Sequence, residues 1–448
     1  MTETLAHSES RVAALVEALD AAPLVEQRGK LVEVIGTTLR VAGLRARIGD
    51  VCEISRAEPS TPIKLMAEVV GFTGETAVLT PLGPVRGLAP SDEIVLARSE
   101  PRVPYGEHLL GRVVDCAMEP LDGKGAIRTF PQRALHGDPP APLERRPIKL
   151  AWETGIRAID GLMPLGQGQR LGIFAAAGSG KSSLLAMIAR HAEADAFVIG
   201  LIGERGREVR EFIEDALGAE GLAKAVVVVA TSDRPAKQRV RAAEVATAVA
   251  EGLREEGRHV VLMMDSITRY ARAMREIGLA AGEPPVRRGY PPSLFAELPM
   301  LFERAGTSAK GSISAIYTVL LEDEEGDPVG EEVRSLLDGH IHLSRALAGR
   351  GHYPAIDVSK SLSRLVGRVA GEETRAAGTS IRSALGLLAD IELLVQMGEY
   401  KPGQDPKADA ALAAREMIED FLRQDLRKAT PLPETIARLR AIAEMLNG

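Results

Sequence analysis

Cysteine is almost absent from this chain. Cys52 and Cys116 are the only two among 448 residues, and neither has a second cysteine or a histidine-rich stretch beside it. This spacing argues against a disulfide framework or a metal site and favours two buried structural thiols. The low cysteine content also fits a protein of the reducing cytoplasm.

Long apolar runs and an excess of basic charge are missing as well. The sequence has no run of the roughly eighteen apolar residues that a membrane-spanning helix needs, and no apolar signal core near its N-terminus. We therefore expect the protein to be made and kept in the cytoplasm. The formal net charge of −7 gives no overall electrostatic reason to expect nucleic-acid binding. No internal repeat or low-complexity tract is evident.

The sequence pattern changes near residue 25, from helical spacing of apolar residues to short β-type runs. Residues 1–24 predict a helix, because one apolar stripe runs along it through Val12, Leu15, Val16 and Leu19. This helix is equally compatible with packing on its own domain and with docking a partner. Residues 25–98 contain short β-type runs such as Gly29–Ile35, separated by turn residues, and predict a small β-barrel domain.

Strands and helices alternate after a proline- and glycine-rich connector at 99–150. Near-continuous apolar runs are typical of buried strands in a parallel sheet, and they lie at Ala196–Ile202, Ala225–Ala230, Val260–Met264 and Ser312–Leu320. The sequence predicts an α/β domain at 99–375, connector included. Apolar stripes at helical spacing then predict a helical domain at 376–448, with a break between its last helices at Pro431–Pro433.

A glycine-bearing turn at 175–182 reads Ala-Ala-Ala-Gly-Ser-Gly-Lys-Ser, between an apolar strand and a helical segment. This order predicts a phosphate-binding loop, because backbone N–H groups and a helix N-terminus there face phosphate oxygens. Lys181 is expected to reach the outer phosphates, and the Ser182 hydroxyl to ligate Mg²⁺. Ala175 stands where the strict pattern has glycine, which leaves the exact loop backbone open. The predicted nucleotide-binding residues of the loop are Ala177, Gly178, Ser179, Gly180, Lys181, Ser182 and Ser183.

Two further apolar strands end beside acidic residues. Asp265 closes one of them, which is the expected place for the carboxylate of the Mg²⁺ shell in a phosphate-loop protein. Glu204 follows another and could orient and activate an attacking water, although a surface turn with solvated Glu/Arg pairs is the alternative. Hydrolysis also needs positive charge at the transition state. Spacing alone does not choose among Arg205, Arg269, Arg304, Arg345 and Arg364.

Longer segments resemble the rotary-type hexameric ATPases. Gly203–Glu208 is similar to their glutamate-containing motif, and Pro354–Arg364 to the alpha/beta-subunit signature of F-type and V-type ATPases. Ala281–Ser293 and Leu336–Ile341 resemble the export ATPases of type III secretion systems and bacterial flagella. The resemblance covers residues 25–445. It implies a central RecA-like phosphate-loop ATPase domain, with an N-terminal β-barrel and a C-terminal helical domain.

The resemblance also implies ATP and Mg²⁺ as cofactors and a role for single residues. Lys181 and Ser182 match the phosphate lysine and the Mg²⁺ hydroxyl, and Asp265 matches the aspartate of the Mg²⁺ shell. Glu204 matches the catalytic glutamate that polarises the water, and Arg205 matches the neighbouring arginine that contacts the phosphate region.

Two more roles follow from the same resemblance, and both place the site at a subunit boundary. Arg364 matches the arginine finger that reaches into the neighbouring subunit's site. Tyr353 matches the aromatic residue that packs on the adenine ring. A finger acting in trans makes sense only in a ring, and the family forms homohexamers.

The resemblance further implies partners and a place in the cell. The N-terminal helix would meet a stator-like regulatory protein, a central stalk protein would occupy the pore, and the C-terminal helices would face export chaperones and cargo. The ring would release cargo from its chaperones and help to unfold it. It would lie in the cytoplasm, peripheral to the membrane export gate at the inner-membrane face of the secretion apparatus. No nucleic-acid partner is expected.

Other functions stay open from the sequence. One is the catalytic subunit of a rotary ATP synthase, against which Arg287–Pro292 and Tyr317–Leu320 argue. Another is a non-catalytic nucleotide-binding scaffold subunit, which usually lacks a residue like Glu204. A transcription-terminating RNA helicase of the same superfamily is more distant. By resemblance, the segment Gly330–Ser335 favours the injectisome branch of the export ATPases over the flagellar branch.

Overall fold

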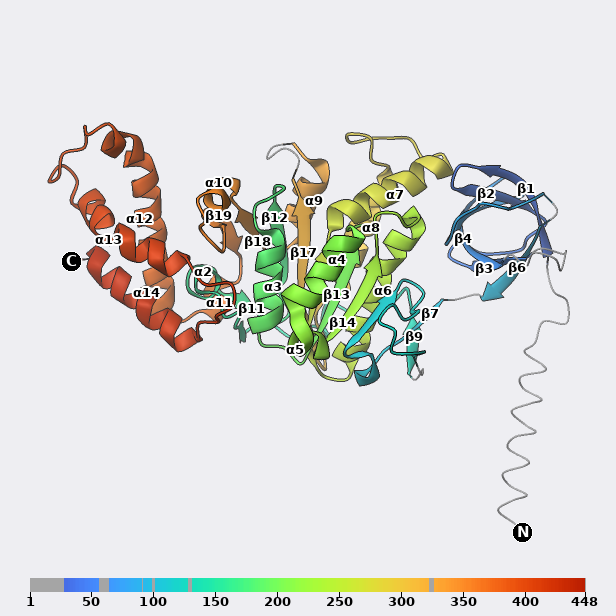
Figure 1. Ribbon diagram of the computed structural model, residues 1–448, viewed down its shortest axis with the longest axis horizontal. Coiled ribbons are helices and arrows are strands. Elements are labelled where there is room, and N and C mark those ends of the chain that lie inside the picture. Colours follow the sequence, from blue (N-terminus) through green and yellow to red (C-terminus); the bar gives the residue numbers. More distant parts are fainter. Residues whose placement is uncertain are drawn as a thin grey trace, which may run out of the picture. The chain divides into compact units, whose positions relative to one another are not determined.

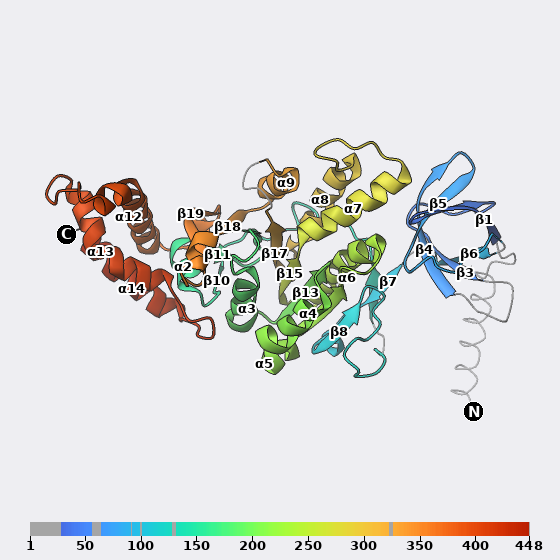
Figure 2. The same ribbon diagram turned by 45° about the horizontal axis from the view of Figure 1, so that its top comes forward.

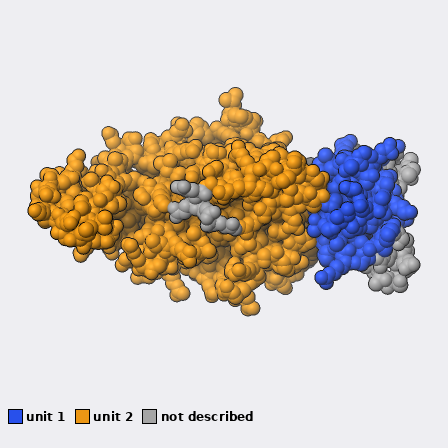
Figure 3. Space-filling model, turned by 90° about the horizontal axis from the view of Figure 1, so that it is seen from above, with its two compact units in different colours: residues 1–100 blue, residues 101–448 orange. Residues whose placement is uncertain are grey.

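The computed structural model describes residues 28–55, 64–90, 92–98, 101–127, 131–321 and 326–447. The helix predicted at 1–24 lies outside the described residues. Contacts divide the chain into two compact units, residues 1–100 and 101–448 (Figure 3). No helix within the described ranges is long and apolar enough to cross a membrane.

The predicted β-barrel is confirmed. Within the described part of the first unit, six strands close into a barrel in the order β1-β2-β5-β4-β3-β6 (Figure 1). Exposed and buried residues alternate from Arg28 to Leu31 in β1, as a strand with one buried face requires, and Leu39, Ile54 and Leu79 fill the interior beside the buried Cys52. The strands are β1 (Arg28–Ile35), β2 (Thr38–Ala42), β3 (Val51–Ser55), β4 (Lys64–Thr73), β5 (Thr76–Pro81) and β6 (Glu93–Arg98).

The second unit is built on a large sheet, which has nine strands among the described residues. Its order is β19-β18-β12-β17-β15-β13-β14-β8, and β16 pairs with β17. From β18 to β8 all neighbours are parallel, whereas β19 is antiparallel to β18. The strands are β8 (Arg112–Asp115), β12 (Arg170–Ala175), β13 (Ala196–Ile202), β14 (Ala225–Ala230), β15 (His259–Asp265), β16 (Gly306–Thr307), β17 (Ser312–Leu320), β18 (Gly339–Leu343) and β19 (Ile356–Ser363).

Helices cover both faces of this sheet (Figure 2). Ile199 and Ile316 pack into one core cluster with α3, whereas their neighbours Val198 and Tyr317 pack into another with α6 and α7. Because successive side chains of a strand point to opposite faces, strands buried on both sides read as continuous apolar runs. The helices are α3 (Lys181–His191), α4 (Gly206–Glu211), the π-helical turn η2 (Phe212–Leu217), α5 (Gly218–Ala223), α6 (Ala236–Glu255), α7 (Ile267–Ala281), α8 (Pro292–Glu303), α9 (Pro328–Leu336) and α10 (Arg345–Gly349).

The C-terminal helices form the predicted helical domain. Ile418, Phe421, Leu439 and Ile442 are buried in the same core cluster as α3, so the helical domain shares its core with one face of the sheet. The predicted break at Pro431–Pro433 falls at the start of the last helix. The helices are α2 (Arg157–Leu162), which packs against this domain, α11 (Val366–Val369), α12 (Glu372–Gln396), α13 (Pro406–Leu422) and α14 (Leu432–Asn447).

The connector contributes structure of its own. β8 extends the large sheet beside β14, and Cys116, just after it, is buried as a free thiol. The remaining short elements are β7 (Arg102–Pro104), the 3₁₀ turn η1 (Glu107–Leu109), β9 (Gln132–Ala134), β10 (Ala151–Trp152) and β11 (Leu165–Gly166). The domain limits expected after residues 24, 98 and 375 stay predictions.

Candidate nucleotide-binding site

The predicted phosphate loop joins β12 to α3 at the carboxyl edge of the parallel sheet. Gly178 and Gly180 have φ values of +77° and +86°, a region that glycine adopts without strain. Gly180 is the residue before α3, so Lys181 and Ser182 lie in the first turn, where backbone N–H groups have no intrahelical acceptor. The buried Ser179 hydroxyl donates to the Ala176 carbonyl at 2.8 Å and closes the turn.

Ala175 fits this loop because it belongs to the strand. It is the last residue of β12, is fully buried, and pairs with Leu320 on one side and Leu343 on the other. A strand position needs no positive φ, so an alanine methyl is tolerated where the stricter pattern has glycine. The positions in the loop that do need positive φ have kept glycine.

Lys181, Asp265 and Glu204 lie together at this edge. Lys181 Nζ forms an ion pair with Asp265 Oδ1 and lies 3.6 Å from Glu204 Oε1. Asp265 ends β15 and Glu204 follows β13, and these strands are parallel neighbours whose carboxyl ends meet. The three side chains are only 12%, 6% and 10% exposed. The structure thus brings together three residues that the sequence placed in one site.

Burial raises the pKa of Glu204 to about 7. The charge of Asp265 and a hydrogen bond with Glu208 raise this pKa further, whereas Lys181 and Arg269 oppose the shift. Oε1 of Glu204 is buried and has no hydrogen-bond partner within the described ranges. A carboxyl group with a pKa near neutrality and a vacant acceptor oxygen can take a proton from a bound water at physiological pH.

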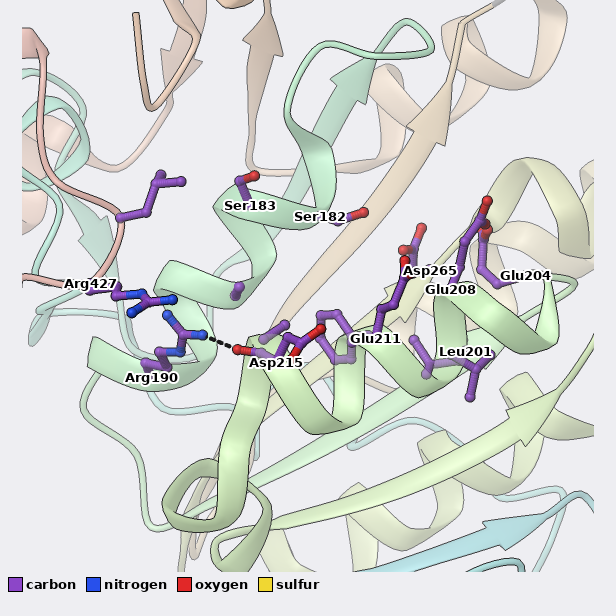
Figure 4. Close-up of a pocket in the computed structure, with 15 residues that line it drawn as sticks. Ser182, Ser183, Arg190, Leu201, Glu204, Glu208, Glu211, Asp215, Asp265 and Arg427 are labelled. Atoms are coloured by element: carbon purple, nitrogen blue, oxygen red, sulfur yellow. Dashed lines mark hydrogen bonds between the residues drawn. The ribbon is translucent and has the colours of Figure 1, made fainter. Parts of the chain in front are cut away.

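A cavity of about 330 Å³ opens beside this cluster. Figure 4 shows Glu204 and Asp265 at one end of it and Arg190 and Arg427 at the other, with Ser182 on the helix between them. Asp215 lies beside Arg190, so the cavity lining carries both acidic and basic side chains along its length.

The residues present fit a Mg²⁺ ion that is held in part by a nucleotide. The described residues contain no group of three or more His, Cys, Asp or Glu side chains that could hold a metal alone. Two oxygens are nevertheless available: within the described ranges, the Ser182 hydroxyl and Asp265 Oδ2 take part in no hydrogen bond. Hydroxyl and carboxylate oxygens, completed by water and phosphate, are what Mg²⁺ prefers in such sites.

Tyr353 packs against the phosphate loop. A Cβ atom on Gly180 would lie 3.0 Å from Tyr353 Cε1. The Tyr353 carbonyl accepts a hydrogen bond from the Gln424 amide at 2.8 Å. The side chain of Gln424, which is buried, accepts from the Arg157 amide at 2.9 Å and donates to the Gly155 carbonyl at 2.8 Å. The segment after α13 is thereby tied both to Tyr353 and to the start of α2.

The two predicted catalytic arginines are both exposed. The Arg205 side chain is 71% exposed and pairs with Glu208 at 3.3 Å. Arg364 is exposed, and its amide donates to the Asp338 carbonyl, while the Asp338 amide donates to the carbonyl of Arg170, both at 2.9 Å. Arg170 begins β12, whereas the phosphate loop follows its end. This strand of six residues separates Arg170 from the phosphate loop by about 16 Å, at ~3.3 Å per residue.

Sequence analysis missed two contacts of this site. The side chain of Arg269 lies over Gly203, where an added Cβ would be 2.9 Å from Arg269 Cβ; in the sequence it was one of five arginines with no feature to single it out. The Thr318 hydroxyl donates to Asp265 Oδ1 at 2.7 Å. A signal for Thr318 was available, because it is one of the few polar residues in the mostly apolar run Ser312–Leu320, although Ser312 and Ser314 share that signal.

Comparison with protein families covers most of the chain. The nucleotide-binding domain of the ATP synthase alpha/beta family matches residues 155–363, and the β-barrel domain of the same family matches residues 31–96. The C-terminal domain of the type III secretion ATPase EscN matches residues 370–441.

Individual relatives agree along nearly their whole length. The type 3 secretion system ATPase of Sinorhizobium fredii is 49% identical over 410 residues, which are 91% of this chain and 90% of the relative. The flagellum-specific ATP synthase of Pseudomonas aeruginosa is 45% identical over 427 residues, 95% and 94% of the two chains. The assembled ATPase EscN of the enteropathogenic E. coli type III secretion system has a TM-score of 0.87 at 45% identity, covering 93% of this chain and all of that one.

A second structure shows EscN in complex with its central stalk EscO, with a TM-score of 0.85 at 44% identity and covering 93% of this chain and all of that one. These matches favour an export ATPase over the synthase-subunit, scaffold and helicase alternatives. The site geometry and the comparisons agree: the chain belongs to the type III secretion and flagellar export ATPases of the ATP synthase alpha/beta family, and it is an ATP hydrolase.

Proposed function

We propose that this chain forms a homohexameric ring in which Mg²⁺-dependent ATP hydrolysis, at sites shared between subunits, powers protein export. The observation that carries this proposal is the position of Arg364. Its backbone is fixed at the amino edge of the sheet, and Lys181 lies at the carboxyl edge of the same sheet. This separation supports a site in which a second chain supplies the arginine.

Within such a site each residue has a defined task. Lys181 exchanges its carboxylate partners for the outer phosphates of ATP, and Tyr353 supports the adenine ring. Glu204 orients the attacking water and takes its proton as the bond to the terminal phosphorus forms and ADP leaves. Arg205 contacts the phosphate region. Arg364 of the next subunit stabilises the charge that develops in the transition state.

Ser182 and Asp265 lie in the same place and would hold a magnesium ion through a hydroxyl and a carboxylate oxygen. When bound, the ion neutralises charge on the phosphate oxygens. The loop residues Ala177, Gly178, Ser179, Gly180 and Ser183 contribute backbone N–H groups and shape rather than charge.

The proposed partners follow from the same family membership. The related ring with its central stalk supports a stalk protein in the pore of this ring. We assign a stator-like regulator to residues 1–24 and export chaperones with their cargo to the C-terminal helices. Such a ring works at the cytoplasmic face of the inner membrane, beside the export gate, where it releases and unfolds cargo.

A mixing experiment tests the shared site. Arg364→Ala and Lys181→Ala chains are each purified and assayed alone, and each is expected to lose at least ~10³-fold in rate. When the two are mixed in equal amounts, some boundaries combine an intact Lys181 with an intact Arg364. Random assembly then restores up to about one quarter of the wild-type rate, because a ring joins unlike faces of neighbouring chains.

The matched control is a chain that carries both substitutions, mixed with either single variant. No boundary in those mixtures has both groups, so the rate must stay at its floor. Light scattering on every mixture shows whether rings form. If rings form and the two single variants still restore nothing, Arg364 does not act across a subunit boundary and the shared-site proposal is wrong.

A further inference from the structure

Thr318 is a polar residue near the end of β17, a mostly apolar strand that also contains Ser312 and Ser314. It is fully buried in β17, which lies between β12, the strand of the phosphate loop, and β15, the strand that ends in Asp265. Across from it on β12 stands the apolar Ile173. A hydroxyl at this depth is costly unless it is hydrogen-bonded, so its partners identify its task.

The hydroxyl of Thr318 points its proton at Asp265. Its Oγ1 lies 2.7 Å from Asp265 Oδ1 and 3.2 Å from the Met264 carbonyl. One hydroxyl has one proton, and a charged acceptor at the shorter distance takes it. Lys181 Nζ contacts the same carboxylate oxygen. Two donors on Oδ1 leave Oδ2 free of donors from the described residues.

This arrangement becomes important when a nucleotide binds. The rotation of an aspartate carboxylate about its last bond is only weakly restrained on its own. In the proposed mechanism Lys181 turns to the phosphates, and Thr318 is then the described donor that stays on Oδ1. Without it the carboxylate can rotate about this bond, so neither oxygen is held in a fixed direction.

We infer that Thr318 is a positioning residue, which holds Asp265 by Oδ1 so that Oδ2 is presented to the Mg²⁺ of the bound nucleotide. The inference rests on the role proposed above for Asp265. A hydroxyl that only satisfied the Met264 carbonyl would support the fold equally well and would leave the magnesium dependence of nucleotide binding untouched.

The test is a binding measurement that needs no turnover. ADP affinity is measured by calorimetry on the full-length chain, with and without Mg²⁺, for wild type, Thr318→Val and Thr318→Ser. Valine has nearly the shape of threonine but no hydroxyl. A hydrogen bond to a charged group is stronger than one between neutral groups, so we expect Thr318→Val to lose at least about 10-fold of the tightening that Mg²⁺ produces. Thr318→Ser should keep it within about 2-fold, and affinity without Mg²⁺ should be unchanged in both.

The matched control is Thr247→Val, which removes another fully buried threonine hydroxyl, one that donates to the Ala243 carbonyl within α6. Thermal unfolding of each variant separates lost stability from lost magnesium coupling. If Thr318→Val behaves like Thr247→Val in the magnesium-dependent affinity, or if serine does not rescue, the inference is wrong.

The variant Asp265→Asn distinguishes the positioning role of Thr318 from the proposed magnesium role of Asp265. If Asp265→Asn removes the magnesium tightening and Thr318→Val does not, Asp265 keeps its role and Thr318 loses its own. If Asp265→Asn leaves the tightening intact, the proposed magnesium role of Asp265 is wrong and the inference falls with it.

Discussion

Arg364 is bound through its amide to the carbonyl of Asp338, and Asp338 is in turn bound to the first residue of β12. The exposed guanidinium therefore stands on a rigid base, one strand-length from the phosphate loop of its own chain. A rigid base matters because an arginine acts on a transition state by preorganised charge, which costs no rearrangement during the reaction.

The first prediction concerns Arg364 and the dependence of activity on ring assembly. The ATPase rate per chain should rise steeply with protein concentration in wild type, because dilution separates the two halves of each site. Arg364→Lys should assemble normally but lose much of the rate, since an ammonium group lacks the planar fork of guanidinium. Rates measured across a dilution series beside light scattering check both. A wild-type rate per chain that is independent of concentration would contradict the trans arrangement.

The second prediction concerns Glu204. Glu204→Gln should bind ATP and assemble as wild type does, yet lose turnover by about 10²-fold or more, because an amide cannot take the proton of water. Glu214→Gln is the matched control, since Glu214 is an exposed glutamate in the next turn, η2, that pairs with Arg210 and does not line the cavity. Steady-state rates and equilibrium nucleotide binding are measured together. Normal turnover in Glu204→Gln would remove this residue from the mechanism.

The third prediction separates two small residues of the loop segment. Gly180→Ala places a methyl at φ +86° and 3.0 Å from the Tyr353 ring, so both strain and crowding should lower nucleotide affinity by about 10-fold or more. Ala175→Gly restores the stricter pattern at a strand position and should leave affinity within about 2-fold. Calorimetric titration with ADP gives both values. Equal effects of the two substitutions would show that backbone conformation does not govern this loop.

The fourth prediction is a pH dependence of stability that involves His342. Burial, followed by the charge of Arg334, lowers the pKa of His342 to about 4, and its ring stacks on Phe174 at 5.2 Å. A depressed pKa means that the folded chain binds fewer protons than the unfolded one between pH 4 and the ordinary value of 6.5. Its stabilising contribution is complete above pH 6.5 and is lost as the pH falls towards 4.

Thermal unfolding between pH 4 and 7 checks this prediction. In His342→Gln the fall in melting temperature on acidification should be shallower than in wild type, although other half-buried histidines such as His340 keep part of the slope. Parallel curves for the two proteins would exclude His342 as a source of acid sensitivity.

The sequence predicted those parts of the site that are contiguous or that end a strand. Lys181 and Ser182 were found because the residues around them predict a strand, a turn and a helix in that order. Asp265 could be placed because the carboxyl ends of parallel strands share one edge. The barrel and the three-part architecture followed from period and composition, and the family resemblance gave the same answer.

Other features depend on which strands are neighbours, and a sequence does not state that order. Thr318 meets Asp265 only because β17 inserts between β12 and β15. Arg269 reaches Gly203 because α7 begins beside the end of β13. The exposed position of Arg205 also has no local signal, since the same residues would pair as well inside a cleft.

Gln424 links Tyr353 directly to the helical bundle through its backbone amide. Three segments meet at Gln424, because its backbone amide bonds the carbonyl of Tyr353 while its side chain bonds Gly155 and Arg157 at the start of α2. A displacement of α13 is therefore transmitted to Tyr353 through direct hydrogen bonds rather than through a flexible linker. Any partner that displaces the bundle also moves the surface on which an adenine ring would rest, so mechanical load and nucleotide exchange in this chain are expected to vary together.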